Sequence, residues 1–562
     1  MFMKGSEIII ESLKAAGVEV IFGLPGGMVI PLYDALYDSD LKHFLVRHEQ
    51  GAAHMADGYA RATGKTGVCI ATSGPGATNL VTGIANAYMD STPMVAITGQ
   101  ARSDLIGTDA FQEADITGIT EPIVKHSYLI KKTEDIPRVF REAFYIASTG
   151  RPGPVLIDIP SDMQLADIEY KPAGKPDLPG YKPTLKGHKK QIRAAARAIA
   201  AAEKPVFYAG GGIITAGAEK ELMAIAKLMK IPVTTTLMGL GGFPENNELS
   251  LGMLGMHGTG YANYAVTHSD LLIGVGARFD DRVTGKLATF ARHAKKIHID
   301  MDPAEISKNV AIDIPIVGDA RNVLAGILAE LKAMKREPKK TAPWIDQINA
   351  WKKKHPLTYK DEKGSIMPQF VIEEINRITK SDAIICTDVG QHQMWSALFY
   401  THVKPRHFVS SGGLGTMGFG FPASIGAKVG RPDKTVIDVA GDGSFQMNIQ
   451  ELATAVCYDI PVIVCILNNG FLGMVRQWQE LFWNKRYSET VISCQPDFAG
   501  VADAYGALGI TITDKKDVGD AIRTAIKAGK PAVLDFHVKA EENVFPMVPA
   551  GKSIDEMIGG HK

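Results

Sequence analysis

Short apolar runs alternate with helix-like segments along most of the chain. Each run is continuously hydrophobic and does not alternate with polar positions, which is typical of strands covered on both faces. Strands of this kind that alternate with helices predict open parallel sheets with helices on both sides, a doubly wound α/β fold. The clearest runs are 68–71, 94–98, 155–159, 206–209, 271–275, 383–387, 436–440 and 462–467.

Two stretches, 170–187 and 335–365, interrupt this alternation. The first is rich in Pro, Gly and Lys, and the second is rich in Lys and Pro with a charged amphipathic piece. Such composition is typical of linkers. The linkers divide the chain into three doubly wound domains of ordinary size. We expect these domains at 1–169, 188–335 and 365–540, with a tail at 541–562.

The bulk composition narrows the possible functions. Hydrophobic residues make up 45% of the 562 positions, and the formal net charge is +0. A neutral chain has no basic field for nucleic acid or an anionic membrane, and it has no run of about 18 apolar residues that could span a bilayer. The five cysteines are odd in number and never spaced as Cys-x-x-Cys, which argues against a disulfide framework or a zinc site. A reducing cytoplasm fits, and no targeting segment is apparent.

Two polar segments follow neighbouring predicted strands of the last domain. Gly441-Asp442-Gly443-Ser444 comes after the run 436–440, and Asn468-Asn469 comes after 462–467. Ligands in open α/β sheets bind beyond the carboxyl ends of strands, so Asp442 and Asn469 are expected at one edge. A carboxylate and an amide oxygen suit Mg²⁺ that also takes oxygens from a diphosphate. The glycines allow a close approach of backbone, and Ser444 can donate a hydrogen bond. Alone, each segment would be an ordinary turn.

The spacing of these segments resembles the fingerprint of the thiamine-diphosphate enzymes, a family that includes pyruvate decarboxylase, pyruvate oxidase and acetolactate synthase. The resemblance implies that Asp442, Asn469 and the backbone carbonyl of Phe471 hold Mg²⁺. It also implies that the large side chain of Met417 lies between the two cofactor rings; otherwise it is a core methionine. Further cofactor contacts implied in this domain are Gly390, Gln391, His392, Gly441, Gly443, Ser444, Leu472, Gly473 and Met474.

The first domain carries a candidate acid. Glu49 lies in Arg47-His48-Glu49, after an apolar stretch, and small residues follow it. Burial there would favour a carboxyl that shares a proton. Out of context it would be a surface acid, but this motif and the segment 56–61 resemble the family's first domain. The resemblance implies that Glu49 shares a proton with the cofactor's aminopyrimidine, that Gly26 approaches the reacting carbon, and that the glycine turn 72–79 lies near the pyrimidine.

The middle domain resembles one branch of the family. The run from Arg278 to Gly285 is similar to the flavin-dependent acetolactate synthases of branched-chain amino-acid synthesis. This implies a largely structural FAD. The glycine turn after 206–209 suits the approach of a dinucleotide, although such turns are weak signals alone. FAD contacts implied by the resemblance are Arg151, Gly210, Gly211, Gly212, His257, Gly276, Arg278, Asp280, Arg282, Asp300 and Asp319.

Four further residues are implied substrate contacts. Arg282 could grip the carboxylate of a 2-keto acid with a fixed guanidinium, or it could form a surface ion pair with Asp280 or Asp281. Trp478 corresponds to the tryptophan that favours 2-ketobutyrate as acceptor, or it is a core residue. Phe111 and Gln112 match the family's substrate and cofactor contacts.

The sequence departs from the family at two positions near the implied active site. Ser161 stands where a lysine is usual at the mouth of the active site, and Arg102 stands where many members have proline. Substrate steering by that lysine and inhibitor sensitivity are therefore not implied. The tail resembles the closing segment of the biosynthetic enzymes.

The resemblance implies a transferase that joins two 2-keto acids. Pyruvate is decarboxylated, and the two-carbon unit is transferred to a second pyruvate or to 2-ketobutyrate with the thiazolium as electron sink. A homodimer or homotetramer is expected, because in the family Glu49 and the Asp442 segment meet across a subunit interface. A small regulatory subunit is also expected. The alternatives are a related carboligase, which would lack the acid at Glu49, an oxidase, and a non-catalytic homologue.

Overall fold

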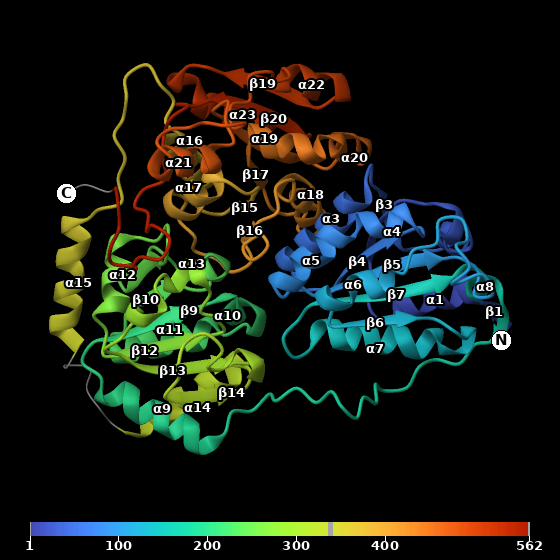
Figure 1. Cartoon of the computed structure of the whole chain (residues 1–562), viewed down its shortest axis with the longest axis horizontal. Coiled ribbons are helices and arrows are strands. Elements are labelled where there is room, and N and C mark those ends of the chain that lie inside the picture. The colour runs from blue at the N-terminus through green and yellow to red at the C-terminus, as the bar shows by residue number, and fades with distance from the viewer. Residues whose placement is uncertain (1, 335–340, 560–562) are drawn as a thin grey trace.

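The computed structural model describes residues 2–334 and 341–559, and these contain three six-stranded sheets. All strand pairs within the three sheets are parallel, with helices on both faces, so the predicted doubly wound α/β fold is confirmed. Figure 1 places the first unit on the right, the second at the lower left and the third above them. The exact domain limits expected from the sequence stay predictions.

The first sheet has the strand order β3-β2-β4-β5-β7-β6. Its central strands are buried at every position, as continuous apolar runs require. Its strands are β2 (Val20–Gly23), β3 (Lys42–Leu45), β4 (Gly67–Ala71), β5 (Met94–Gln100), β6 (His126–Leu129) and β7 (Pro154–Pro160). Its helices are α1 (Gly5–Ala15), η1 (Gly27–Val29), α2 (Ile30–Tyr37), α3 (Glu49–Thr63), α4 (Pro75–Asn79), α5 (Val81–Met89), α6 (Ile116–Thr120), η2 (Glu121–Ile123), η3 (Thr133–Asp135), α7 (Ile136–Ser148) and α8 (Ser161–Leu165). Strands β1 (Phe2–Lys4) and β8 (Asp167–Glu169) pair antiparallel beside it.

The central sheet has the order β11-β10-β9-β12-β13-β14. Its strands are β9 (Pro205–Ala209), β10 (Val233–Thr235), β11 (Ser250–Met253), β12 (Leu271–Val275), β13 (Lys295–Asp300) and β14 (Ile314–Val317). The helices around it are α9 (Lys189–Ala201), α10 (Gly211–Ala216), α11 (Glu219–Met229), η4 (Leu237–Gly239), α12 (Gly260–Thr267), α13 (Asp281–Thr284), η5 (Leu287–Thr289), η6 (Pro303–Glu305), α14 (Ala320–Ala333) and α15 (Ala342–Lys354).

The third sheet has the order β16-β15-β17-β18-β20-β19. Its strands are β15 (Ile384–Thr387), β16 (Phe408–Ser410), β17 (Val436–Gly441), β18 (Val462–Asn468), β19 (Leu508–Ile512) and β20 (Ala532–His537). Its helices are α16 (Pro368–Thr379), α17 (Gln391–Phe399), α18 (Gly420–Gly430), α19 (Asp442–Phe445), η8 (Gln446–Glu451), α20 (Leu452–Cys457), α21 (Gly473–Phe482), α22 (Phe498–Tyr505), η9 (Lys515–Asp517) and α23 (Val518–Ala528).

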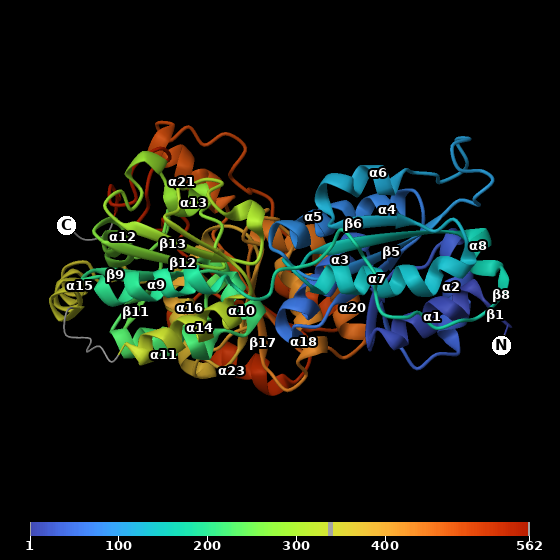
Figure 2. The same cartoon turned by 90° about the horizontal axis from the view of Figure 1, so that it is seen from below.

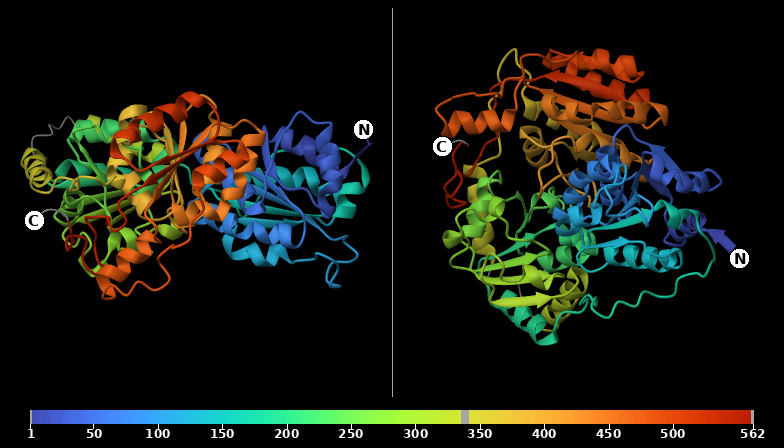
Figure 3. Two further views of the ribbon diagram at one scale, coloured as in Figure 1. Left: turned by 90° about the horizontal axis from the view of Figure 1, so that it is seen from above. Right: turned by 45° about the vertical axis from the view of Figure 1, so that its right-hand side comes forward.

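The two predicted linkers differ in structure. Residues 170–187 contain no helix or strand and run as an extended segment from the first unit to α9 (Figure 3). The second stretch contains α15, whose Trp344 and Ile348 are buried in the core of the central unit. The interpretation of 335–365 as a linker throughout is therefore wrong, because the amphipathic piece packs its apolar face on the central unit. Residues 335–340 lie outside the described residues, as do residue 1 and residues 560–562 at the ends of the predicted limits.

The first and third units share a core through helices α3 and α18. The two helices lie side by side between the sheets (Figure 2), and their approach depends on small residues. A Cβ on Gly58 would lie 2.0 Å from the carbonyl oxygen of Ala423, and one on Gly426 would lie 1.9 Å from that of Met55. Glycine is therefore required at both positions, since any side chain would force the helices apart.

The tail after β20 crosses from the third unit to the central unit (Figure 1). Val544 is buried and exchanges two hydrogen bonds with the Gln477 side chain on α21. The Val548 N–H then donates to the carbonyl oxygen of Met256 at 2.8 Å. The tail thus ties α21 to the central unit.

The composition raised two points that the structure addresses: membrane-spanning helices and the state of the cysteines. No described helix is both long and apolar enough to cross a membrane. Cys69, Cys386 and Cys465 are buried, and burial raises the pKa of the Cys69 thiol to about 12. Cys457 and Cys494 are exposed.

Candidate active site

Asp442 and Asn469 lie at the same edge of the third sheet. Strands β17 and β18 pair in parallel with Gly441 opposite Leu467, so the backbone leaves both strands at the same edge of the sheet. The Asp442 side chain is 1% exposed and accepts a hydrogen bond from the Gln495 amide. Burial raises the pKa of Asp442 to about 6, and backbone N–H groups that include that of Gly470 hold it from rising further. The two predicted oxygen ligands are therefore adjacent, as the strand order required.

The segment after Asn469 closes over this edge. The N–H of Phe471 donates to Asn469 Oδ1 at 3.1 Å, and the Asn469 amide donates to Gln391 Oε1 at 3.3 Å. A Cβ on Gly473 would lie 2.2 Å from the same Gln391 oxygen, so a side chain there would displace the Gln391 amide. Met474 follows in the first turn of α21 and packs against the core of the third unit. The predicted contacts 469–474 thus form one structural unit with Gln391.

Two glycines provide space at the turn after β17. A Cβ on Gly441 would lie 3.0 Å from the His392 ring. A Cβ on Gly443 would lie 2.9 Å from Leu472 and 3.9 Å from Met417. Met417 therefore lies close to this turn, and its place between the two cofactor rings stays a prediction.

Ser444 and His392 use their polar atoms differently. The Ser444 hydroxyl accepts from the Gly441 N–H at 3.1 Å and donates to the Gly441 carbonyl at 3.2 Å, so it closes the turn instead of pointing to a ligand. His392 follows Gly390 in the first turn of α17, and its Nε2 is buried without a partner among the described residues. A buried polar atom without a partner is costly, and a diphosphate oxygen would supply one. The donor set therefore fits a diphosphate with a divalent cation.

The first unit assembles a second cluster around Glu49. This residue occupies the first turn of α3 and is 7% exposed, so it is not a surface acid. The Asn79 amide donates to Glu49 Oε2 at 2.9 Å. A Cβ on Gly76 would lie 3.2 Å from Glu49 Oε1, and one on Gly26 would lie 2.5 Å from the Thr72 methyl group. The glycine turns after β2 and β4 therefore meet the carboxyl at one edge of the sheet.

Phe111 and Gln112 lie on the irregular segment between β5 and α6. Gln112 has φ +58° and packs against Gly74, because a Cβ on Gly74 would lie 2.9 Å from its Cα. Phe111 is 80% exposed.

Arg102 and Ser161, the two residues that differ from the usual residues of the family, also lie near this segment. The Arg102 guanidinium is paired with Asp104 at 3.1 Å, and Ser161 begins α8. The next residue, Asp162, accepts from the Ser103 N–H at 2.9 Å.

The two clusters are separate within one chain. Among the described residues, no hydrogen bond or ion pair joins the Glu49 carboxylate to Asp442 or Asn469. The third unit instead reaches the first through Glu451, which accepts from the N–H groups of Arg47 and His48, each at 3.0 Å. Glu451 therefore fixes the backbone just before Glu49.

The glycines of the central unit pack on one another. A Cβ on Gly210 would lie 2.1 Å from the Gly276 carbonyl, and one on Gly212 would lie 2.6 Å from the Gly276 Cα. The Gly276 φ of +56° also favours glycine. Gly211 contacts Met238. The main structural effect of these glycines is therefore to allow the turns after β9 and β12 to pack closely.

Several buried polar atoms near that edge lack partners among the described residues: His257 Nδ1, His298 Nδ1, Tyr208 Oη and Thr235 Oγ1. Burial lowers the pKa of His257 to about 4, and the Arg282 charge adds to this, so the ring is neutral at pH 7. Unsatisfied polar atoms at the carboxyl ends of parallel strands fit a polar cofactor such as a dinucleotide.

The predicted charged contacts of the central unit are mostly engaged within the protein. Arg151 pairs with Glu305 at 2.7 Å, and Arg278 lies 3.9 Å from Asp280. Three acids accept backbone N–H groups at turns and helix starts: Asp280 from Val283, Asp300 from Asp302 and Asp319 from Asn322. Each therefore shapes the edge of the sheet through backbone hydrogen bonds.

Arg282 and Trp478 are less constrained than the sequence suggested. The Arg282 side chain is 63% exposed, with Asp281 at 3.9 Å as its ion-pair partner. This agrees with the alternative of a surface ion pair with Asp281, and the grip of Arg282 on a substrate carboxylate stays a prediction. Trp478 is half-buried on α21 with its ring edge toward Phe482, at 5.6 Å between centroids.

Three residues of the site had no assigned role in the sequence reading: Gln495, Asn79 and Glu451. Asn79 ends the glycine turn 72–79, so the motif could have predicted that Asn79 lies near the site. Gln495 lies in an irregular segment, and Glu451 acts on a backbone about 400 positions earlier, so neither carried a local signal.

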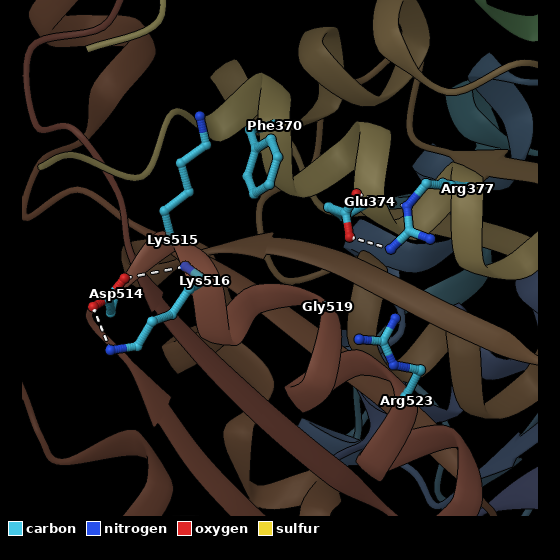
Figure 4. Close-up of a pocket in the computed structure, with 8 residues that line it drawn as sticks. All are labelled: Phe370, Glu374, Arg377, Asp514, Lys515, Lys516, Gly519 and Arg523. Atoms are coloured by element: carbon cyan, nitrogen blue, oxygen red, sulfur yellow. Dashed lines mark hydrogen bonds and ion pairs between the residues drawn. The ribbon is translucent and has the colours of Figure 1, made fainter. Parts of the chain in front are cut away.

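A separate surface cavity of about 530 Å³ contains none of these residues (Figure 4). It lies between α16 and α23 and is lined by Phe370, Glu374, Arg377, Asp514, Lys515, Lys516, Gly519 and Arg523. Its cations pair with neighbouring acids, Arg377 with Glu374 and Lys516 with Asp514. Of the other two lining cations, Lys515 pairs with Asp361 and Arg523 with Asp520, so all four have an ionic partner.

Comparison with known proteins agrees with the three-unit fold and its two clusters. Models of the thiamine pyrophosphate (thiamine diphosphate) enzymes match the chain three times: the N-terminal TPP binding domain at 3–119, the central domain at 192–327 and the C-terminal TPP binding domain at 388–536. The class defined by the fold and site is therefore that of the thiamine pyrophosphate enzymes.

Individual relatives narrow the class. The chain is 54% identical to the probable acetolactate synthase large subunit of Methanocaldococcus jannaschii over 99% of its own length and 95% of the relative. It is 52% identical to the large subunit of Corynebacterium glutamicum (98% and 89%) and 50% identical to that of Haemophilus influenzae (99% and 98%). The chain belongs to the family of acetolactate synthase large subunits.

Proposed function

We propose that this protein is the catalytic subunit of an acetolactate synthase. It would decarboxylate pyruvate and join the two-carbon unit to a second pyruvate or to 2-ketobutyrate. The products would be 2-acetolactate and 2-aceto-2-hydroxybutyrate, intermediates of branched-chain amino-acid synthesis. The observation that carries the proposal is the buried Glu49 cluster together with the adjacent Asp442 and Asn469, in a chain 54% identical to a probable acetolactate synthase large subunit.

The third unit would hold thiamine diphosphate and Mg²⁺. Asp442, Asn469 and the Phe471 carbonyl would be the metal ligands, and His392 would meet the diphosphate. Met417 would support the bent shape of the cofactor. When bound, thiamine diphosphate supplies an acidic ring carbon that becomes a nucleophile, and it then accepts the electrons of decarboxylation.

Glu49 would hold the proton that starts the reaction. Its Oε2 already accepts from Asn79, so Oε1 is the atom left to exchange a proton with the cofactor's pyrimidine nitrogen. Glu49 is buried, and Gly76 beside Oε1 carries no side chain that would block this atom.

The central unit would bind FAD as a structural cofactor. The partnerless ring nitrogen of His257 and the Tyr208 hydroxyl would find partners on it. The glycine contacts of Gly210, Gly212 and Gly276 would shape the nucleotide edge.

A second copy of the chain would complete the active site. Glu49 and Asp442 are not in contact within one chain, so the Glu49 cluster of one protomer would face the Asp442 edge of the other. The exposed Phe111 and Arg282 and the half-buried Gln112 and Trp478 would then surround the two keto acids. A small regulatory subunit is a further expected partner, because the relatives are named large subunits.

The direct test is a product assay. The protein is incubated with pyruvate, thiamine diphosphate, Mg²⁺ and FAD, and acetolactate is measured together with acetaldehyde and hydrogen peroxide. We expect acetolactate, and a mixed product when 2-ketobutyrate is added. Acetaldehyde or peroxide without acetolactate would instead identify a decarboxylase or an oxidase and contradict the proposal.

A further inference from the structure

The loop that carries Met417 belongs to the third unit but is held by the first. This segment, Ser410–Phe419, joins β16 to α18 and is called the Met417 loop below. It contains Gly412, Gly413, Gly415 and Gly418, so its unbound backbone has many accessible conformations. Fixing it over Gly443 therefore needs specific contacts.

Asp90, at the end of α5, binds the start of the loop. The Gly412 N–H donates to Asp90 Oδ2 at 2.9 Å, and the Gly413 N–H donates to Asp90 Oδ1 at 2.7 Å. The Asp90 side chain is fully buried. Each carboxylate oxygen thus accepts one loop amide, which fixes both the position and the direction of the backbone.

Asn86, one turn earlier on α5, closes the loop from the inside. Its Oδ1 accepts from the Ser411 hydroxyl at 2.5 Å and from the Thr416 hydroxyl at 3.3 Å. The Thr416 N–H donates in turn to the Ser411 hydroxyl at 2.9 Å. The two ends of the loop therefore meet on one amide of the first unit, next to Met417.

Arg61 connects these contacts to helix α3. It donates to Asp90 Oδ2 at 3.0 Å and pairs with Asp57 on its own helix. Another of its nitrogens donates to the Ser410 carbonyl at 3.0 Å, and its guanidinium lies 5.4 Å from the centre of the Phe419 ring. Arg61 thus touches both ends of the Met417 loop.

We propose that Asn86, Asp90 and Arg61 are positioning residues that set the Met417 loop in the shape that receives thiamine diphosphate. The proposal rests on the cofactor assignment of the proposed function. The loop carries the side chain that supports the bent cofactor, and its conformation is imposed by buried hydrogen bonds from another domain of the same chain. Loss of these bonds would lower affinity, because the cofactor would then have to order the loop itself.

The test compares Asp90→Asn with a matched control, Glu142→Gln. Both replace a buried carboxylate that receives an arginine, but Glu142 pairs with Arg138 and Tyr128, away from the loop. Hydrogen–deuterium exchange of the peptide covering 411–418 and calorimetric binding of thiamine diphosphate with Mg²⁺ are measured for both. We expect faster exchange in this peptide and about tenfold weaker binding for Asp90→Asn only, which corresponds to the loss of one to two buried hydrogen bonds.

A second pair of variants applies if Asp90→Asn does not fold. Thr416→Val removes the hydroxyl that reaches Asn86, and Thr416→Ser restores it. Weaker cofactor binding and faster loop exchange in Val but not in Ser support the proposal, and equal behaviour of the two variants overturns it.

The two proposals fail in different ways. Wild-type protein that does not bind thiamine diphosphate contradicts the cofactor assignment, and with it this proposal. Wild-type protein that binds, with Asp90→Asn and Glu142→Gln alike in exchange and affinity, overturns the positioning role alone. Neither measurement requires turnover, so the absence of acetolactate does not affect the result.

Discussion

Buried polar side chains define both halves of the site at the residue scale. Glu49 begins α3 and Asp442 begins α19, and each carboxylate accepts from one side-chain amide, Asn79 or Gln495. The strand pattern and the glycine turn after β17 indicated Asp442, because parallel strands bring their carboxyl ends to one edge. Glu49 was indicated by the resemblance of its Arg-His-Glu motif to the family.

Glu49→Gln is expected to reduce the turnover of pyruvate by about 10²–10⁴-fold, since the amide cannot hold the exchangeable proton. Thiamine diphosphate binding should change far less, because Gln keeps the size of the side chain and its contact with Asn79. Steady-state acetolactate kinetics and calorimetry on the same preparation separate the two effects. Normal turnover in this variant would remove Glu49 from the chemistry.

Asp158 predicts a specific dependence of stability on pH. This residue of β7 accepts from Thr98 and Gln100, and burial raises its pKa to about 7, partly offset by these two bonds. In the unfolded chain its pKa is about 3.9, so the native state binds more protons between these values. The contribution of Asp158 to stability is therefore full below about pH 4 and is lost as the pH rises to about 7.

The variant Asp158→Asn has no such titration. We expect wild type to lose stability relative to the variant as the pH rises from about 4 to about 8, by at most about 4 kcal/mol. Denaturant unfolding at several pH values measures the difference between the two proteins. A difference that stays constant over this range would show that Asp158 is ionised throughout.

Other residues of the site could not be predicted from the sequence. The exposure of Arg282 depends on α13 being a single turn on the surface, which the motif does not encode. Glu451 and Asp90 act on backbone groups more than 300 positions away, so no local pattern reveals them. Side-chain chemistry at strand ends was predictable, whereas contacts between units were not.

At the scale of elements, all eight apolar runs became strands of parallel sheets, because continuous hydrophobic runs fit only strands covered on both faces. The prediction failed where a short amphipathic helix lay in a charged segment. Helix α15 ends in three consecutive lysines, which resemble a linker, and it buries Trp344 and Ile348 on one face. Only the packing of α15 on the central unit shows that its apolar residues, and not its lysines, determine where the helix lies.

Trp344→Ala tests whether α15 belongs to the central unit. Trp344 is 1% exposed, and its ring N–H donates to the Pro205 carbonyl at 3.2 Å. We expect a loss of about 3–5 kcal/mol in the unfolding free energy of this unit, the usual effect of removing a buried tryptophan. Gln347→Ala, on the exposed face of the same helix, is the control and should be neutral. Equal melting curves for the two variants would mean that α15 is only a tether.

The molecule as a whole contains two incomplete halves of a site per chain. Helix α3 carries Glu49 at its start and Arg61 in its last turn, so one rigid element serves the Glu49 cluster and also the Met417 loop. In the proposed dimer these halves belong to two different active sites. The chain would then link the sites mechanically, which a single-chain site would not require.

Mixing two inactive variants tests this arrangement. Glu49→Gln disables the proton-holding half, and Asp442→Asn disables the metal-binding half, so each homodimer is expected to be inactive. If a site uses Glu49 of one chain and Asp442 of the other, a mixed dimer has one site with both defects and one intact site. Random exchange of subunits would then restore about a quarter of wild-type activity, since half the dimers are mixed and each has one working site of two. If both groups came from the same chain, every site would keep one defect, and the mixture would stay inactive although sedimentation showed that subunits had exchanged.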